Sequence, residues 1–448
     1  MGAFVTALLR PFPLIQNKEG ILKDQYDVII VGSGAAGGTL AYQLSQVCPD
    51  KRILLIEKGG VVKEGEAGKF WPFFLKYYRR LVLGSRSKEG VIIYAGEMLG
   101  GTTVISCGNM VRSPELERRF YELGVDDLND YFAQAENQLG VKALPAERIM
   151  AGSATITSAA GRLGLLMAPM PKAVKTTCDN CGNCVKGCHR NAKWDVRAWI
   201  KQASAVNVDV VRGTVKKVLR HGDKAIGVQL TTEKYFSHRV VLAAGALNTP
   251  QILLRSGIDA GRGLSIHPFE VVYGKVIGES RQTKGISMAA YYKPVPKILL
   301  SPFLDEKSQM FFACGSKWIL KNSREKLLGI MVKVADPEAN GRVYANGISY
   351  QLPAAAQRRL DKGYDLAQNI LLKAGCQIGS IVRTAKFPRG AHPQGTAKIG
   401  EVVDRNLRVY KMPGLYVSDA SILPLATGTP PILTLVALNL RLARHLDT

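Results

Sequence analysis

Residues 27–37 of the chain read Asp-Val-Ile-Ile-Val-Gly-Ser-Gly-Ala-Ala-Gly, an apolar run that leads into a G-x-G-x-x-G motif. A helix-compatible stretch follows, and a second apolar run ends on Glu57, about 20 residues after the motif. In a strand–turn–helix unit of this kind, Gly32 allows the tight turn, Gly34 lets a pyrophosphate approach the backbone, and Gly37 lets helix and strand pack closely. The helix N-terminus binds the phosphates and Glu57 binds a ribose. The sequence therefore predicts a dinucleotide site, for NAD or FAD, on a Rossmann-type unit.

The composition is that of a globular protein with enough chain for a large core. Its 448 residues are 46% hydrophobic and 21% charged, which predicts about two or three domains. No apolar stretch approaches the ~18 residues that span a bilayer, and the N-terminus lacks signal-peptide features, so we expect a cytoplasmic protein. Phe4, Val5, Leu8 and Leu9 form a candidate face for peripheral contact with a membrane or a partner protein. The alternative is that this segment packs on the body of the protein.

The net charge of +24 is large, but it does not point to nucleic acid. Lysine and arginine are spread along the chain without a block of five or more, and no nucleic-acid-binding motif is present. We therefore expect no nucleic-acid partner. The eight cysteines have no secretory context, which favours metal or redox use over disulfides.

Beyond the first unit, several segments resemble the glucose–methanol–choline (GMC) family of FAD oxidoreductases. A glycine-rich segment with Gly-Gly-Thr-Thr at 100–103 resembles the first family signature, and Gly245 to Ile258 resembles the second. A segment that contains His392 resembles the catalytic region. The segments lie in the family order and are residues 97–110, 245–258, 263–268, 392–396, 403–409 and 415–421.

The resemblance implies an α/β fold with an α+β second domain. A Rossmann-type FAD-binding domain is expected to be built from the discontinuous segments 20–125, 200–272 and 392–448. A mixed substrate-binding domain is expected to comprise 126–199 and 273–391, where the sequence is less patterned.

The resemblance also implies FAD rather than NAD. The first turn and Glu57 would hold the ADP half, the 100–103 loop would lie along the flavin and pyrophosphate, and Val215 would contact the adenine. The Asp419 segment and the start of the last helix would reach the flavin, where a helix N-terminus favours negative charge. The expected FAD contacts are Gly32, Gly34, Gly37, Glu57, Gly100, Gly101, Thr102, Thr103, Val215, Asp419 and Ala420.

Alcohol oxidation requires a base for the hydroxyl proton, and histidine suits this task because its ordinary pKa is near 6.5. Of the six histidines, His221, His238 and His445 occupy turn, strand-flank and helix-end positions. His267 resembles a family position that is more often structural. His392 lies in the family's active-site motif and is the predicted base, the alternative being a structural role.

The family places an asparagine or histidine, followed by proline, at the start of the last helix. Here residues 428–431 read Gly-Thr-Pro-Pro, so Pro430 replaces that second catalytic residue. Proline offers no side-chain hydrogen bond, and the hydroxyl of Thr427 or Thr429 is a candidate replacement. Thr429 is also the expected N-cap of the last helix, as Thr249 is of an earlier one. The departure leaves room for a modified activity.

A short segment has the C-x2-C-x2-C-x3-C spacing of bacterial ferredoxins, with His189 where they usually have proline. Three hypotheses remain open: an iron–sulfur cluster, a less favoured zinc ion, and metal-free thiols. Ferredoxins use the fourth cysteine for a second cluster, for which no other cysteine group is present, and zinc usually draws its pairs from more distant segments. Some GMC members carry a similar loop followed by Ala-Lys-Trp, as at 192–194. The candidate ligands are Cys178, Cys181, Cys184 and Cys188.

The leading hypothesis is an FAD-dependent oxidoreductase that oxidises a CH–OH group of a small alcohol or sugar by hydride transfer to flavin N5. A dehydrogenase is favoured over an oxidase, because a cluster would carry electrons away from the flavin; the acceptor itself is open. Two alternatives remain. One is a non-redox, lyase-type enzyme that retains FAD, motivated by Pro430. The other is an iron–sulfur/flavin electron-transfer subunit of a larger complex.

Overall fold

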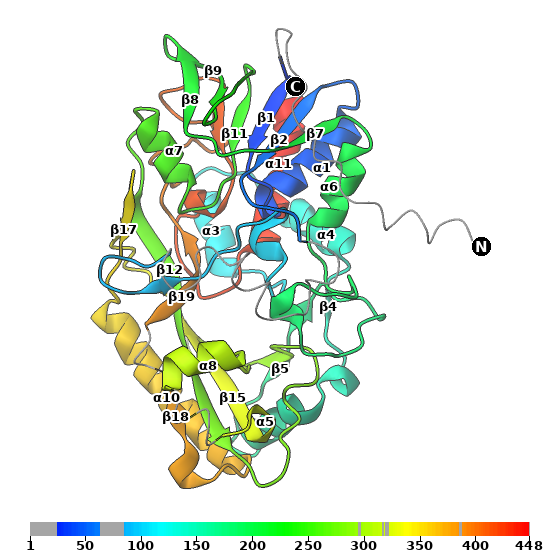
Figure 1. The fold of residues 1–448 in the computed structure, drawn as a ribbon, viewed down its shortest axis with the longest axis vertical. Helices are drawn as coiled ribbons and strands as arrows, with labels where there is room; N and C mark the ends of the chain where they lie inside the picture. The colour runs from blue at the N-terminus through cyan, green and yellow to red at the C-terminus, as the bar shows by residue number, and fades with distance from the viewer. Residues whose placement is uncertain are drawn as a thin grey trace, which may run out of the picture.

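The structure, a computed structural model of the chain, describes residues 25–62, 85–293, 297–315, 318, 322–384 and 388–447. The candidate N-terminal apolar face, Phe4 to Leu9, lies outside these residues. Figure 1 shows a parallel sheet in the upper half of an elongated molecule and a larger, mainly antiparallel sheet in the lower half. The structure confirms the predicted α/β fold, with a second region of mixed helices and strands. The division of the chain into five segments stays a prediction.

The five-stranded sheet is parallel throughout, in the order β20-β11-β1-β2-β7. Its central strands are buried along almost their whole length, as expected of a parallel sheet covered by other elements. Helix α1 packs against α11 and α6 beside this sheet (Figure 1). The elements are β1 (Val28–Val31), α1 (Ala35–Val47), β2 (Ile53–Glu57), α6 (Arg197–Ser204), β7 (Val208–Arg212), β11 (Val240–Leu242), β20 (Leu415–Val417) and α11 (Ile432–Asp447).

Helix α7 (Thr249–Arg255) begins one residue earlier than the sequence predicts. Its N-cap is Asn248 rather than Thr249. The Thr249 hydroxyl is engaged elsewhere, since it donates a hydrogen bond to Asp419 at 2.5 Å. The Thr249 hydroxyl therefore makes a long-range hydrogen bond in place of the expected local cap.

Helix α11 begins at Ile432, so Thr429 is not its N-cap, contrary to the prediction. The residue before a proline is pushed out of the helical region, so Pro430, which precedes Pro431, cannot belong to the helix. The Thr429 hydroxyl instead lies 2.6 Å from that of Thr427.

The eight-stranded sheet is built around the long strand β12 (Arg262–Lys275). Its path is β14-β15-β12-β16-β17, while β18 and β19 also pair with β12, and β3 pairs with β19. Helices α5 (Ala151–Gly161) and α10 (Ala354–Lys373) cover one face, and the opposite face carries a second apolar cluster with Phe269 and Met331. The other strands are β3 (Ile92–Ile93), β14 (Ile298–Pro302), β15 (Leu327–Val334), β16 (Gly341–Tyr344), β17 (Gly347–Ser349), β18 (Val382–Arg383) and β19 (Arg389–Gln394).

Smaller elements complete the fold. A three-stranded antiparallel sheet, ordered β10-β9-β8, lies at the upper end of Figure 1, and β4–β6 and β5–β13 form two short pairs. These elements are β4 (Lys142–Ala143), β5 (Ala168–Pro169), β6 (Pro171–Lys172), β8 (Lys217–His221), β9 (Lys224–Gln229), β10 (Lys234–Phe236), β13 (Ala290–Tyr291), α3 (Pro114–Glu122), α4 (Asn129–Leu139) and α8 (Lys307–Cys314).

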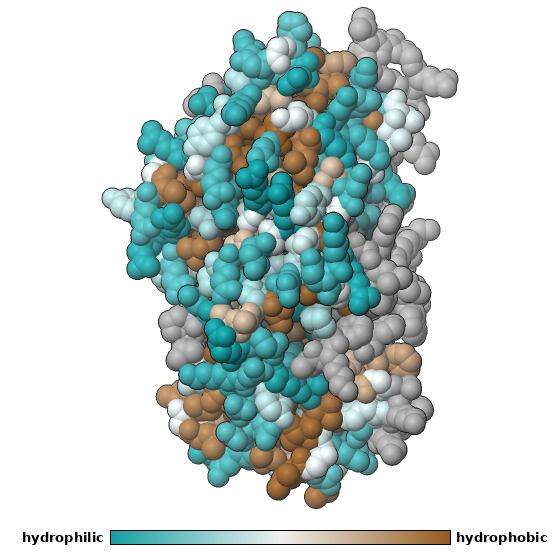
Figure 2. All heavy atoms as spheres, turned by 90° about the vertical axis from the view of Figure 1, so that its left-hand side faces the viewer, coloured by the Kyte–Doolittle hydropathy of each residue, from teal (hydrophilic) through white to brown (hydrophobic). Residues whose placement is uncertain are grey.

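One face of the molecule is largely polar. Figure 2 shows hydrophilic residues over most of this face, with apolar patches in its upper part and at its lower end. The most exposed large apolar side chains among the described residues are Ile277, Ile378 and Leu166. None of the described helices combines the length and apolar character needed to cross a bilayer.

Candidate active site

A cavity of about 500 Å³ lies between the two main sheets. The carboxyl ends of β1, β2 and β11 open into it, the position at which parallel α/β sheets bind ligands. From the other side it is walled by residues of the larger sheet, among them Phe269, Met331 and His392. Of the predicted cofactor residues, Gly37 and Gly100 do not line it. Those that do are Gly32, Gly34, Glu57, Gly101, Thr102, Thr103, Val215, Asp419 and Ala420.

The three motif glycines differ in what surrounds them. A Cβ atom on Gly32, whose φ is +102°, would lie 2.4 Å from the carbonyl oxygen of Ala243, and one on Gly37 would lie 1.9 Å from that of Gly32. A Cβ on Gly34 would meet no protein atom within 4 Å, and Gly34 lines the cavity. Packing thus explains Gly32 and Gly37, whereas the bare backbone at Gly34 fits a bound pyrophosphate.

Glu57 is tied to the motif turn. Its Oε2 accepts hydrogen bonds from the Ser33 amide at 3.0 Å and from the Ser33 hydroxyl at 2.6 Å, and its Oε1 accepts from the Gly59 amide at 2.8 Å. Ser33 Oγ in turn accepts from the Gly100 amide at 3.0 Å. Ser33, a variable position of the motif that the sequence analysis did not single out, therefore links the acid to the second glycine-rich loop.

That second loop is held in place by a buried lysine. Lys193 Nζ donates to the carbonyl oxygens of Thr103 at 2.8 Å and Val104 at 3.2 Å, and burial lowers its pKa. The Thr103 hydroxyl donates to the Gly100 carbonyl at 2.6 Å. The Ala-Lys-Trp segment at 192–194 thus supports the loop at the cavity wall.

Asp419 joins two loops that line the cavity. Its Oδ2 accepts hydrogen bonds from the Gly245 amide at 2.8 Å and the Thr249 hydroxyl at 2.5 Å, and its Oδ1 accepts from the Ser421 amide at 2.8 Å. Burial raises the pKa of its carboxyl group. These bonds fix the backbone around Gly245 and Ala420, so Asp419 shapes the wall through the main chain.

His392 has a left-handed backbone, with φ +56°. It lies at an irregularity in the β12–β19 ladder, where the register shifts between the pairs Ser265–Gln394 and His267–Ala391. Such a bulge redirects a side chain, and a non-glycine residue in this region costs about 1–3 kcal/mol, a strain that concentrates at functional sites. The conformation of the backbone therefore fixes the direction of the His392 side chain.

His392 contacts a second histidine directly. Its Nδ1 lies 3.0 Å from Nδ1 of His267, which is almost fully buried. The Nε2 atom of His267 accepts a hydrogen bond from the Gly428 amide at 3.1 Å and lies 3.1 Å from the side-chain nitrogen of Gln394. His267, expected from the sequence to be structural, therefore belongs to the site.

The hydrogen bond from the Gly428 amide shows which ring nitrogens of His267 and His392 carry protons. A backbone N–H can only donate, so Nε2 of His267 carries no proton, and its proton lies on Nδ1. That Nδ1–H then donates to Nδ1 of His392, whose own proton lies on Nε2. His392 thus rests in the tautomer with an N–H at the ring position away from His267.

Both histidines are neutral near pH 7. Burial lowers the pKa of His267 well below its ordinary value, with further lowering by His392, Lys333 and Lys293. Burial and then Lys333 lower the pKa of His392 in the same way. A neutral imidazole is the form that can accept a proton.

The cavity wall includes Pro430 and Pro431 but neither Thr427 nor Thr429. These two hydroxyls bond to each other, so the structure does not bring the proposed replacement hydroxyls to the cavity. Lys333 does line it. Lys333 is absent from the predicted site residues, although a lysine within the apolar run Leu-Leu-Gly-Ile-Met-Val-Lys-Val of β15 is an unusual feature of the sequence.

The four cysteines of the ferredoxin-like segment lie outside the cavity wall, although Val185 between them reaches it. Cys178 and Cys184 pack against a small apolar cluster of Leu144, Ile286 and Ala289. Burial raises the pKa of the Cys178 thiol, and raises that of Cys181 to about 11. Both are therefore protonated thiols near neutral pH.

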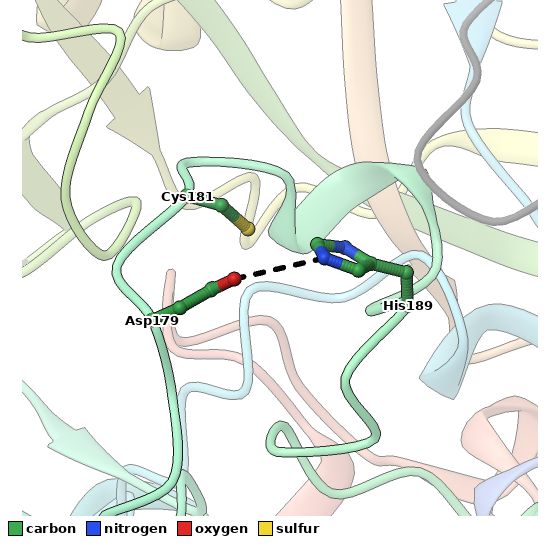
Figure 3. Close-up of side chains that lie close together, drawn as sticks. All are labelled: Asp179, Cys181 and His189. Carbon is green, nitrogen blue, oxygen red and sulfur yellow. Dashed lines mark ion pairs between the residues drawn. The ribbon is translucent and has the colours of Figure 1, made fainter.

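Figure 3 shows a neighbouring group, in which Asp179 and His189 form an ion pair at 3.6 Å beside Cys181. Among the described residues, these form the only group of three or more histidine, cysteine, aspartate or glutamate side chains whose ligand atoms all lie within 4.8 Å of one another. Asp179 is also paired with Arg190 at 3.1 Å.

Tetrahedral zinc with Zn–S bonds of about 2.3 Å would bring its sulfur ligands to about 4 Å from one another. The four cysteines do not form such a group, so their arrangement does not fit zinc. The iron–sulfur cluster stays a prediction.

The chain matches known proteins over most of its length. The two GMC oxidoreductase family models match residues 26–269 and 337–439. An uncharacterized protein of Methanocaldococcus jannaschii is 28% identical over 425 residues, which cover 94% of this chain and 100% of that protein. Paromamine 6'-oxidase of Streptomyces fradiae is 25% identical over 512 residues, with coverage of 94% and 91%. The crystal structure of pyridoxine 4-oxidase from Mesorbium loti aligns with a TM-score of 0.69 at 18% identity, covering 94% of this chain and 99% of that one.

Proposed function

Because this chain belongs to the GMC oxidoreductase family, and is thus an FAD-dependent oxidoreductase, we propose that it oxidises a CH–OH group of a small alcohol or sugar with His392 as the base. The observation that carries the proposal is the single cavity that joins the motif turn and Glu57 to His392. The carboxyl ends of the parallel strands and the face of the larger sheet meet there, which brings a dinucleotide site and a candidate base together.

The residues around the cavity fit FAD. Gly34 presents bare backbone to the pyrophosphate position, and the 100–103 loop faces the same space. The start of α11 also lies in the wall, where unpaired amides of a helix N-terminus favour negative charge. FAD held there supplies a hydride acceptor at flavin N5.

His392 receives the hydroxyl proton as the C–H bond breaks, so that the alcohol becomes a carbonyl. In the resting tautomer its Nε2 carries a proton, and acceptance at that atom requires the alternative tautomer, with protons on Nδ1 of His392 and Nε2 of His267. In that form Nε2 of His267 carries a proton and cannot accept the hydrogen bond from Gly428. The loss of this bond raises the free energy of the form by about 1–3 kcal/mol. The Gly428 amide therefore sets the fraction of molecules in which His392 is ready to act.

The test is anaerobic mixing of the FAD-loaded protein with a panel of primary and secondary alcohols and sugars, without NAD. We expect one of them to bleach the flavin absorbance. The variant His392→Asn, whose side chain tolerates the left-handed backbone, should retain the flavin spectrum and lose about 10²–10⁴-fold in reduction rate. The matched control is His221→Asn, because His221 is exposed on β8.

Failure of the whole panel to bleach the flavin, or equal rates for His392→Asn and the unmodified protein, would contradict the proposal. Turnover of a substrate without flavin reduction would instead support the non-redox alternative. Reoxidation in air compared with an added electron acceptor separates oxidase from dehydrogenase. Iron analysis of the same sample tests the iron–sulfur prediction.

A further inference from the structure

Lys333 is a cation in an apolar strand. All eight residues of β15 are buried, and Lys333 is only 2% exposed. Burying a charge is unfavourable unless it is paired or hydrogen-bonded. A lysine at this position therefore needs a partner.

The side chain faces the cavity rather than the helices behind the sheet. Val332 and Val334 belong to the apolar cluster under α10, and side chains alternate along a strand. Met331 and Lys333 are thus on the opposite face, and both line the cavity. Phe269, paired with Lys333 across the β12–β15 ladder, lines it too.

Two other buried lysines show how this fold normally satisfies such a group. Lys172 Nζ donates to Asn109 Oδ1 at 2.5 Å and to the carbonyl oxygens of Ser287 at 2.9 Å and Cys107 at 3.0 Å. Lys193 has two carbonyl acceptors. With the residues that the structure describes, Lys333 Nζ has neither a hydrogen bond nor an ion pair.

The acids near the cavity do not supply the missing charge. Asp305 is bound by Arg389 through two bonds, at 2.5 and 3.1 Å. Burial raises the pKa of the Cys107 thiol to about 11, so it is protonated near pH 7. Burial lowers the pKa of Lys333 to about 8, and most molecules keep its charge at neutral pH. With the acids that the structure describes, the Lys333 charge therefore has no acidic partner in the cavity, and this charge acts on His392.

Several large apolar side chains line the cavity together with Lys333, among them Phe269, Met288, Phe303 and Met331. A ligand that matches it has an apolar body and a single negative charge. A phosphate monoester carries close to two charges near pH 7, which one lysine would leave partly unpaired. A carboxylate needs only one cation.

We propose that Lys333 binds a carboxylate of the substrate, so that the enzyme acts on an alcohol that is also a carboxylic acid. The inference rests on the proposed function, since it places the hydroxyl group of the same molecule at His392. A carboxylate next to Lys333 also cancels the positive field that acts on His392. The bound acid would thus make its own base stronger.

The test measures binding to the oxidised FAD-loaded protein, which does not depend on turnover. Benzoate and octanoate are compared with benzamide and octanamide by calorimetry and by the shift of the flavin absorption spectrum. We expect at least tenfold tighter binding of the carboxylates. Lys333→Met should abolish that preference and Lys333→Arg should keep it, while Lys362→Met, at an exposed lysine of α10, should leave it unchanged. An unaltered flavin spectrum of each variant shows that it has folded.

Equal binding of acids and amides, or an undiminished preference in Lys333→Met, overturns the inference. The second comparison uses turnover, with hydroxymethylbenzoate against benzyl alcohol and hydroxyoctanoate against octanol. Flavin reduction by the neutral alcohols without preference for the acids would refute the inference and leave the proposed function standing. Lys333-dependent carboxylate binding without flavin reduction by any alcohol would refute the proposed function and leave the carboxylate site standing.

Discussion

Nδ1 of His267 lies 3.0 Å from Nδ1 of His392, and the amide of Gly428 donates to the opposite nitrogen of His267. A main-chain amide thus determines, through one imidazole, which nitrogen of the candidate base carries the proton. We therefore infer that His267 acts on the reaction through His392, as a positioning residue.

The first prediction concerns the tautomer. In protein labelled with ¹⁵N-histidine, NMR should show His392 protonated at Nε2 and His267 at Nδ1. His267→Gln should slow flavin reduction by about 10–100-fold, because an amide that donates to Nδ1 of His392 cannot shift its proton as an imidazole can, and so holds His392 in the tautomer with a proton on Nε2. FAD affinity should stay within about twofold. A His392 signal from the Nδ1–H tautomer in the unmodified protein would contradict the proton assignment.

The second prediction concerns pH. Because burial and Lys333 hold the pKa of His392 well below 6.5, the neutral base persists through neutral pH. The rate of flavin reduction by an uncharged alcohol should therefore stay flat as the pH falls past 6.5, and decline only at lower pH. Lys333→Met removes a nearby positive charge, raises the pKa of His392 and should move this decline to higher pH. Lys362→Met, at an exposed lysine of α10, is the control. An identical pH profile in Lys333→Met would show that Lys333 does not act on His392.

The third prediction separates cofactor binding from folding at two neighbouring glycines. Gly34→Ala places a methyl group in the cavity without touching protein, so it should weaken FAD binding by tenfold or more while the melting temperature of the FAD-free protein changes little. Gly37→Ala drives a methyl group against the Gly32 carbonyl and should destabilise the protein by about 1–3 kcal/mol. Thermal unfolding and FAD titration measure both. Normal FAD affinity in Gly34→Ala would argue against a pyrophosphate at this turn.

The fourth prediction concerns the buried ion pair of Asp305 and Arg389, each about 1% exposed. Asp305→Asn leaves an uncompensated guanidinium group and should cost about 3–5 kcal/mol of unfolding free energy. Glu122→Gln, which removes the exposed partner of Arg118 and Arg119, should cost less than about 1 kcal/mol. Urea denaturation compares them. Similar losses in the two variants would indicate that Arg389 finds another partner.

The sequence could predict what depends on local pattern. The β1–α1–β2 unit follows from one apolar run, three glycines and a second apolar run, and the structure has it with Val28 paired to Ile53. The resemblance to the GMC family extended that unit to a discontinuous fold. The motif in the sequence identifies His392 as a candidate, but it does not reveal in which direction the side chain points.

The rest depends on long-range register. His267 contacts His392 because β12 pairs with β19 across a bulge. The sequence of neither strand alone predicts that bulge. Thr249 is a residue type that commonly caps helices, yet its hydroxyl group donates a hydrogen bond to Asp419, 170 residues away. Lys333 stands out in the sequence as a lysine in an apolar run, but only the assembled fold shows that it is buried and lines the cavity.

The discontinuity of the parallel sheet also constrains how the protein acquires its cofactor during biosynthesis. The edge strand β20 is formed by residues 415–417, and the cavity wall extends to Leu435. The pocket therefore cannot close until the residues up to Leu435 have left the ribosome. Since a ligand stabilises only the state that binds it, FAD should protect chains that include residues 415–435 from proteolysis and leave shorter chains that lack them unprotected.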